Sequence, residues 1–160
     1  FSFLRRPVVL AALRALADRI EHWTGPTGVT LFDVPGAPLP AADTAAPPRL
    51  LPMWDSILLA YSDRSRVVPA DYRPLIFRRN GDVLPTLLVD GYVAGVWRPV
   101  ERGIEATAFH RLDDTAWQGL EAEAGALLAF LAAREPTVYR RYAHWWTKQL
   151  PNAEVRILSK

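Results

Sequence analysis

The chain has 160 residues, half of them apolar, so it is long enough to form one or two compact domains with a buried core. It has no cysteine, which excludes disulfides, thiol catalysis and cysteine-ligated zinc, and its histidines (His22, His110 and His144) are widely spaced, so we expect no metal and no other cofactor. The net charge of +2 is small, but nearly all the cations are arginines, whose planar guanidinium suits bidentate contact with phosphate.

The sequence shows no sign of membrane insertion or export. No apolar run reaches the ~18 residues that a membrane span needs, and the N-terminus lacks the three-part pattern of a signal peptide. We therefore expect a cytoplasmic protein without a membrane partner. The chain begins with Phe1 rather than Met, and its opening residues resemble the interior of a domain, so we also expect an upstream portion beyond this sequence.

Residues 1–34 predict a helix followed by a hairpin. Apolar residues recur at helical spacing after Pro7 and indicate a helix over about 8–19. Short strands at Ile20–Trp23 and Val29–Phe32 flank Gly25 and Gly28, which favour a tight turn. The segment is either the end of a winged helix or an ordinary helix packed on a hairpin.

Residues 35–48 contain five prolines and predict a linker, so a second unit is expected over 49–160. In its first part, 50–54 is expected to be extended, 56–61 to be helix or strand, and 69–73 to open a short helix. Two strands at 83–89 and 92–97 around Asp90-Gly91 predict a hairpin with a primed turn, and a third strand follows at 104–110.

The remainder predicts two helices and a last strand. Asp113 is expected to cap a long helix with one apolar stripe, which Pro136 ends. A second helix from Thr137 carries aromatic and basic residues, which either dock it on the sheet or contact single-stranded nucleic acid. The strand 154–158 is expected at the sheet edge.

Four motifs between residues 49 and 98 suggest a family. They are LPMWD at 51–55, YSDRSR at 61–66, RNGD at 79–82 and LPTLLVDG at 84–91, closed by GVWR at 95–98. Together they resemble the C-terminal part of a family of bacterial winged-helix DNA-binding proteins. That family includes the DNA glycosylases that unhook azinomycin-type interstrand crosslinks and excise bulky alkylated bases.

The resemblance favours an α+β fold: the remnant of a winged helix, with helix and hairpin wing, followed by a small antiparallel β-sheet or barrel domain covered by helices. It implies that the partners are double-stranded DNA and the upstream winged-helix units of the same protein. It also implies hydrolysis of an N-glycosidic bond without a metal or nucleotide cofactor.

Whether the chain takes part in catalysis stays open. The family's catalytic motif contains glutamines in its N-terminal part, whereas this chain has only Gln118 and Gln149, neither in such a motif. We therefore assign no catalytic residue. The sequence fits a DNA-binding scaffold of a glycosylase, a noncatalytic winged-helix regulator or interaction domain, or a domain that only braces the upstream units.

The candidate DNA-binding residues are Arg64, Arg66, Arg78, Arg79, Trp23 and Asp55. Arginines on loops can straddle phosphates, although pairing with Asp63, Asp71 and Asp82 would explain them equally. Trp23 could wedge into a duplex or belong to the hairpin core. Asp55 would lie on the DNA-facing side by resemblance, or it could cap the segment that follows.

Overall fold

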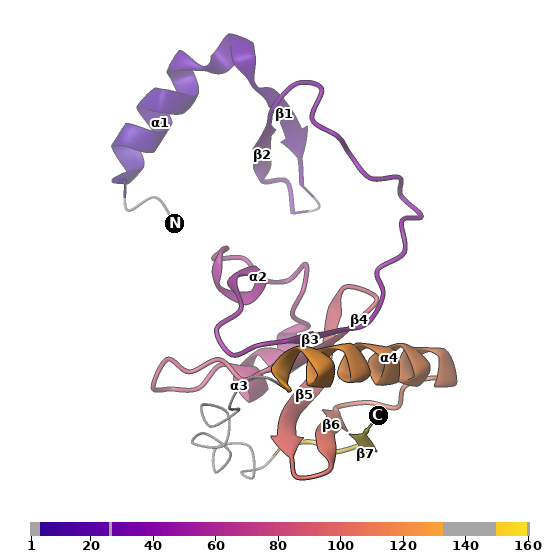
Figure 1. Ribbon diagram of the computed structural model, residues 1–160. Coiled ribbons are helices and arrows are strands. Elements are labelled where there is room, and N and C mark those ends of the chain that lie inside the picture. Colours follow the sequence, from indigo (N-terminus) through magenta and orange to yellow (C-terminus); the bar gives the residue numbers. More distant parts are fainter. Residues whose placement is uncertain (1–3, 26, 133–149, 160) are drawn as a thin grey trace. The chain divides into compact units, whose positions relative to one another are not determined.

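The protein has a mixed α+β fold made of two compact units. The computed structural model describes residues 4–25, 27–132 and 150–159 (Figure 1). The units comprise residues 1–44 and 45–160. Residues 137–148, where the second C-terminal helix is expected, lie outside the described residues.

The second unit is built on a five-stranded antiparallel sheet in the order β3-β4-β5-β6-β7. Its strands are β3 (Arg49–Leu51), β4 (Thr86–Val89), β5 (Tyr92–Val100), β6 (Gly103–Ala108) and β7 (Glu154–Leu158). Among the described residues, β3 and β7 each pair with one strand, so the sheet is open. The predicted hairpin, third strand and edge strand are confirmed.

The hairpin between β4 and β5 follows directly from its turn residues. Asp90 and Gly91 have φ values of 51° and 77°, the two positive angles that a type I′ turn requires. The first strand is shorter than predicted, because Val83 bridges to Phe77 and Leu84 donates its N–H to the Ile76 carbonyl, so β4 begins only at Thr86.

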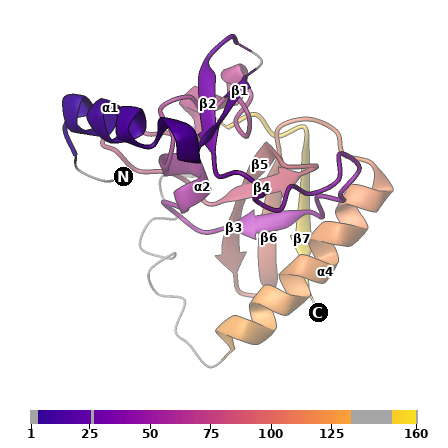
Figure 2. The same cartoon turned by 90° about the horizontal axis from the view of Figure 1, so that it is seen from above.

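Helix α4 (Asp114–Leu131) lies along one face of this sheet (Figure 2). Asp113 caps it as predicted, accepting a 2.7 Å hydrogen bond from the Ala116 N–H. The stripe that includes Trp117 and Leu120 is buried against Leu87, Trp97 and other residues of this sheet face. This is the first of two cores that the described residues of the unit form.

The second core lies on the opposite face, under three short helices. These are α2 (Ser56–Leu59), the 3-10 helix η2 (Ala70–Tyr72) and α3 (Arg73–Ile76). Successive residues of a strand point to opposite faces, so Leu88 and Val96 pack here, against Leu58 and Ile76, while Leu87 serves the first core. The run at 56–61, left open between helix and strand, forms α2.

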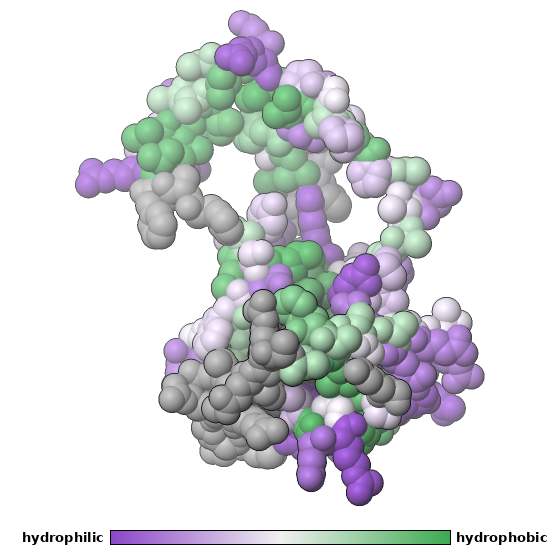
Figure 3. All heavy atoms as spheres, viewed as in Figure 1, coloured by the Kyte–Doolittle hydropathy of each residue, from purple (hydrophilic) through white to green (hydrophobic). Residues whose placement is uncertain are grey.

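The first unit contains α1 (Arg6–Ala15), the 3-10 helix η1 (Ala17–Arg19), and a hairpin of β1 (Glu21–Thr24) and β2 (Thr30–Asp33). Helix α1 begins two residues earlier than predicted, because proline is tolerated in the first turn. The last residues of the predicted helix form η1 instead. No side chain of α1 is buried. Figure 3 accordingly shows hydrophobic side chains on its surface.

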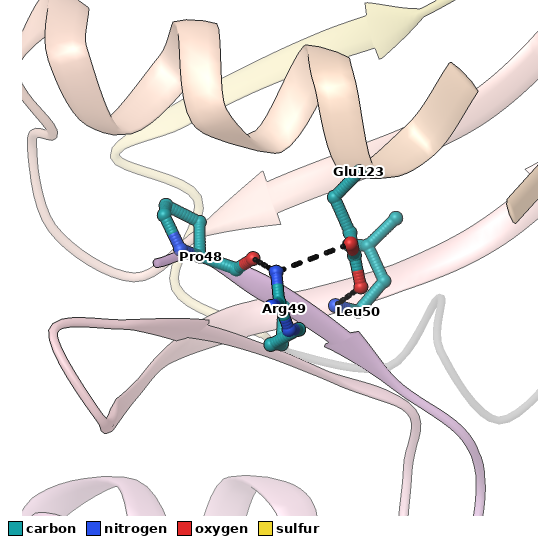
Figure 4. A network of polar contacts seen from close by, with 4 residues as sticks. All are labelled: Pro48, Arg49, Leu50 and Glu123. Atoms are coloured by element: carbon teal, nitrogen blue, oxygen red, sulfur yellow. Dashed lines mark hydrogen bonds and ion pairs between the residues drawn. The ribbon is translucent and has the colours of Figure 1, made fainter. Parts of the chain in front are cut away.

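Glu123 links α4 to the edge strand β3 (Figure 4). Its carboxylate accepts hydrogen bonds of 3.4 Å from the Leu50 N–H and from Nη1 of Arg49, which also donates to the Pro48 carbonyl. Such a partly exposed pair adds little free energy by itself. It does fix where the chain enters the sheet, directly before the segment that carries the candidate site.

Candidate nucleic-acid interface

The first arginine loop runs from residue 61 to 69, after α2. The Asp63 carboxylate accepts the Ser65 N–H at 2.9 Å, and the Arg64 carbonyl accepts the N–H groups of Val67 and Val68. The hydrogen bonds from Ser65 and the charge of Arg66 hold the pKa of Asp63 below its usual value. The loop thus has a defined backbone, from which the exposed Arg66 extends.

The second arginine loop closes between Phe77 and Val83, which form an antiparallel bridge. Inside it, the Arg78 N–H donates to the Asp82 carbonyl at 2.8 Å, and the Gly81 N–H donates to the Arg78 carbonyl. Gly81 has a φ of 91°, a conformation that glycine adopts without strain. The tight turn leaves Arg79 exposed at its tip.

Arg64 joins the two loops. Its guanidinium carbon lies 4.8 Å from the centroid of the Phe77 ring, and its Nε donates to the Leu58 carbonyl. A cation over an aromatic face gains about 0.5–1 kcal/mol at a partly exposed site. Arg64 is therefore a packing residue that brings the loop bearing Arg66 beside the loop bearing Arg79.

The four candidate arginines are not equivalent. Arg64 and Arg78 are partly buried, and burial lowers the pKa of the Arg78 guanidinium, which stays charged at neutral pH. Arg66 and Arg79 are exposed, and neither forms an ion pair within 4.0 Å with a carboxylate of the described residues. The Asp82 side chain is instead held by Asn80. Arg66 and Arg79 are thus the members of this set best placed to meet a polyanion.

Asp55 and Trp54 form the turn into α2. The Asp55 carboxylate accepts the Ile57 N–H at 2.9 Å and caps the helix, which confirms the capping interpretation. Trp54 has a φ of 55°, a strained conformation for a bulky residue. A direct contact of Asp55 with DNA stays a prediction.

Trp23 lies on β1 of the first unit, opposite Leu31. Its side chain is 48% exposed, so the interpretation of Trp23 as hairpin core is wrong. The exposed ring leaves the wedge hypothesis as a prediction. The neighbouring His22 ring packs edge-on against Phe32, with centroids 5.0 Å apart, and this contact braces the hairpin.

Gln118 is exposed on α4, and Gln149 lies outside the described part of the chain. In that described part, no three His, Asp or Glu side chains gather where a metal ion could be held. None of the helices that the structure describes has the length and apolar character to cross a membrane.

The fold and the surface define the class: this is an α+β protein, and its two arginine loops suit a polyanionic partner. The comparisons are more specific. The family model described as "DNA glycosylase AlkZ-like" matches residues 1–130, and the chain therefore belongs to the AlkZ-like DNA glycosylase family. This confirms the resemblance drawn from the motifs.

A solved structure shares the fold. The DNA glycosylase AlkZ of Streptomyces sahachiroi matches with a TM-score of 0.63 and 22% identity, over 78% of this chain and 34% of that one. This chain thus spans about a third of the length of that glycosylase. No curated protein sequence matched.

One residue of the interface was not found from the sequence. The Phe77 ring packs against the Arg64 guanidinium and so positions both loops. In the sequence, however, an aromatic residue beside an arginine-rich stretch has no distinguishing local pattern. Only the contact across 13 positions, from 64 to 77, reveals its role.

Proposed function

We propose that this chain is the DNA-binding scaffold of a DNA glycosylase that excises alkylated or crosslinked bases by hydrolysis of the N-glycosidic bond. Membership of the AlkZ-like family supports the reaction class. The observation that carries the DNA-binding role is the pair of exposed arginines, Arg66 and Arg79, on loops joined through Arg64 and Phe77.

In this proposal the arginines hold the phosphate backbone and do not read sequence. Guanidinium groups on loops neutralise phosphates and release counterions, which orients a duplex without base-edge contacts. Arg64 keeps the loops together, and Asp55 fixes the start of α2 beside them. The glutamine-containing catalytic motif would lie in another part of the full-length protein.

The first unit is proposed to be the end of a winged helix, with β1 and β2 as the wing and Trp23 at its surface. The succession of α1 and an antiparallel hairpin supports this assignment. The exposed apolar residues of α1, such as Val8 and Leu10, would pack against preceding winged-helix units of the same protein, which acts on bacterial DNA in the cytoplasm.

The test is duplex DNA binding over a salt series, with wild type and an Arg66→Glu, Arg79→Glu double variant. We expect the variant to lose about tenfold or more in affinity at low salt. We also expect the slope of log K against log salt to fall by about two, since each phosphate contact contributes about 0.9.

An Arg102→Glu, Arg111→Glu double variant is the matched control, because both arginines are exposed outside the two loops and the change in net charge is the same. Its affinity should change far less than that of the Arg66→Glu, Arg79→Glu variant. Equal losses in both would show only a general charge effect, and an unchanged Arg66→Glu, Arg79→Glu variant would refute the proposed surface. Base release by the full-length protein from alkylated DNA then separates a glycosylase from a noncatalytic regulator.

A further inference from the structure

The second unit has a groove of about 520 Å³ that the DNA-binding proposal does not use. Val93 and Ala94 of β5, both buried, line it together with Tyr72 of η2, His110 after β6, and Tyr92 after the hairpin turn. Its volume is within the range of small-molecule sites, which are mostly apolar with a few convergent polar groups.

One wall of the groove is a braced aromatic pair. The rings of Tyr72 and His110 are stacked, with centroids 6.0 Å apart and planes 10° apart, and the Tyr72 hydroxyl lies 3.0 Å from Nδ1 of His110. Tyr72 also packs edge-on against the buried Phe109, with centroids 5.0 Å apart. These contacts hold the wall in place before any ligand binds.

Tyr92 supplies another ring that the core does not need. Its side chain is 51% exposed although it belongs to the sheet, and it lines the groove beside the rigid Asp90-Gly91 turn. Tyrosine presents a large, stiff surface with little loss of side-chain entropy on binding. The groove is therefore lined by aromatic rings from η2, from β5 and from the segment after β6.

The described residues of the groove carry a net negative charge. Asp71 and Asp90 are exposed and line it, and no lysine or arginine is among the described residues that form it. Carboxylates at the rim repel phosphate, so this groove is poorly suited to a nucleic-acid backbone. Aromatic faces and carboxylates both attract cations.

We propose that this groove binds a small planar organic cation, about the size of a nucleoside or smaller. The ligand's flat body lies against the tyrosine and histidine rings, and its positive charge faces Asp71 and Asp90. The groove adjoins the first arginine loop at Pro69, but none of the four candidate arginines lines it. The inference does not rest on the proposed DNA-binding function.

The test uses 1-methylquinolinium as a planar cation and quinoline, uncharged at neutral pH, as its near isostere. Amide shifts of the isotope-labelled 160-residue chain are followed by two-dimensional NMR during titration of each. We expect saturable shifts at Tyr72, Tyr92, Ala94 and His110, and binding of quinoline weaker by about tenfold or more.

Variants of the groove test the role of charge and ring separately. An Asp71→Asn, Asp90→Asn double variant should bind the cation about tenfold more weakly, and asparagine keeps the positive φ at position 90 accessible. Tyr92→Ala should weaken binding about threefold or more. Glu121→Gln, an exposed carboxylate on α4, is the control and should bind like wild type.

The inference is overturned if the cation gives no saturable binding, if its shifts fall outside the groove, or if quinoline binds equally well. It is also overturned if the doubly substituted and wild-type proteins, both folded by their spectra, bind the cation alike. Weakening by added salt would support it, because exposed charges are screened.

Discussion

On β7, the Glu154 carboxylate holds the Arg156 guanidinium over the first core. Nε and Nη2 of Arg156 donate to the same Glu154 oxygen at 2.9 and 2.6 Å. The guanidinium also lies 4.4 Å from the ring centroid of Trp117, so it covers one of the two tryptophans of the first core. The pair therefore closes the core at the edge strand β7.

The pairing predicts a pH dependence of stability. Burial raises the pKa of Glu154, but the hydrogen bonds and positive charge of Arg156 outweigh burial, so the pKa is lowered. A lowered folded-state pKa gives stability that is present above the unfolded-state value, about 4.3, and lost as pH falls through the folded-state value.

Glu154→Gln should therefore be less stable than wild type at neutral pH, and the difference should shrink as pH falls below about 4. Urea unfolding at a series of pH values measures it. Glu121→Gln on the exposed side of α4 gives the effect of removing a carboxylate that has no such pairing. A difference between Glu154→Gln and wild type that is the same at every pH would contradict the argument.

The role of a residue could be predicted only where its partners lie close to it in the sequence. Asp113 was identified as a cap because the pattern lies within four residues. Arg64 and Arg66 look alike in the sequence, but Arg64 lies over Phe77 and Arg66 is exposed. Tyr72 and His110 are 38 positions apart, and nothing local indicates that they meet.

Among the elements, Gly95 of β5 lies at a close approach between its two neighbouring strands. It pairs with Leu87 on one side, next to a β-bulge, and with Ala108 on the other. A Cβ there would overlap the Thr107 carbonyl oxygen and lie 2.9 Å from the Cα of Ala108. Backbone atoms of a paired strand cannot move aside without breaking the sheet.

Gly95→Ala should destabilise the protein by about 2–3 kcal/mol, as overpacking of a core typically does. Gly125→Ala is the matched control, since that position in α4 has no neighbouring atom within 4 Å. It should stabilise the protein by about 0.5–1 kcal/mol, because alanine favours the helix. Urea midpoints measure both, and a neutral Gly95→Ala would show that β5 and β6 can separate.

Elements set by turn chemistry and periodicity were predicted well, and those set by packing were not. The Asp90-Gly91 hairpin and α4 follow from residues near each other in the chain. After Ser56, the run at 56–61 has no polar position that would mark a buried face, so it suits a strand or a helix. It forms a helix because Asp55 caps it and Leu58 enters the second core.

At the scale of the whole molecule, the two units differ in how much apolar surface they bury. Residues 45–160 contain both cores, one on each face of the sheet, including Trp117 and Leu58. In residues 4–44, neither α1 nor η1 buries a side chain. Apolar burial is the main favourable contribution to folding, so the stability of the chain resides in the second unit.

This difference predicts that residues 45–160 fold when produced alone. We expect a cooperative thermal transition with a midpoint close to that of the whole chain, and a well-dispersed NMR spectrum. Residues 1–44 alone should lack a cooperative transition, because so short a chain rarely buries enough surface. Amide exchange in the whole chain should be faster in α1 than in β5, which lies between two cores. A shorter protein that unfolds at a much lower temperature, or slow exchange in α1, would show that the first unit contributes to the stability of the second.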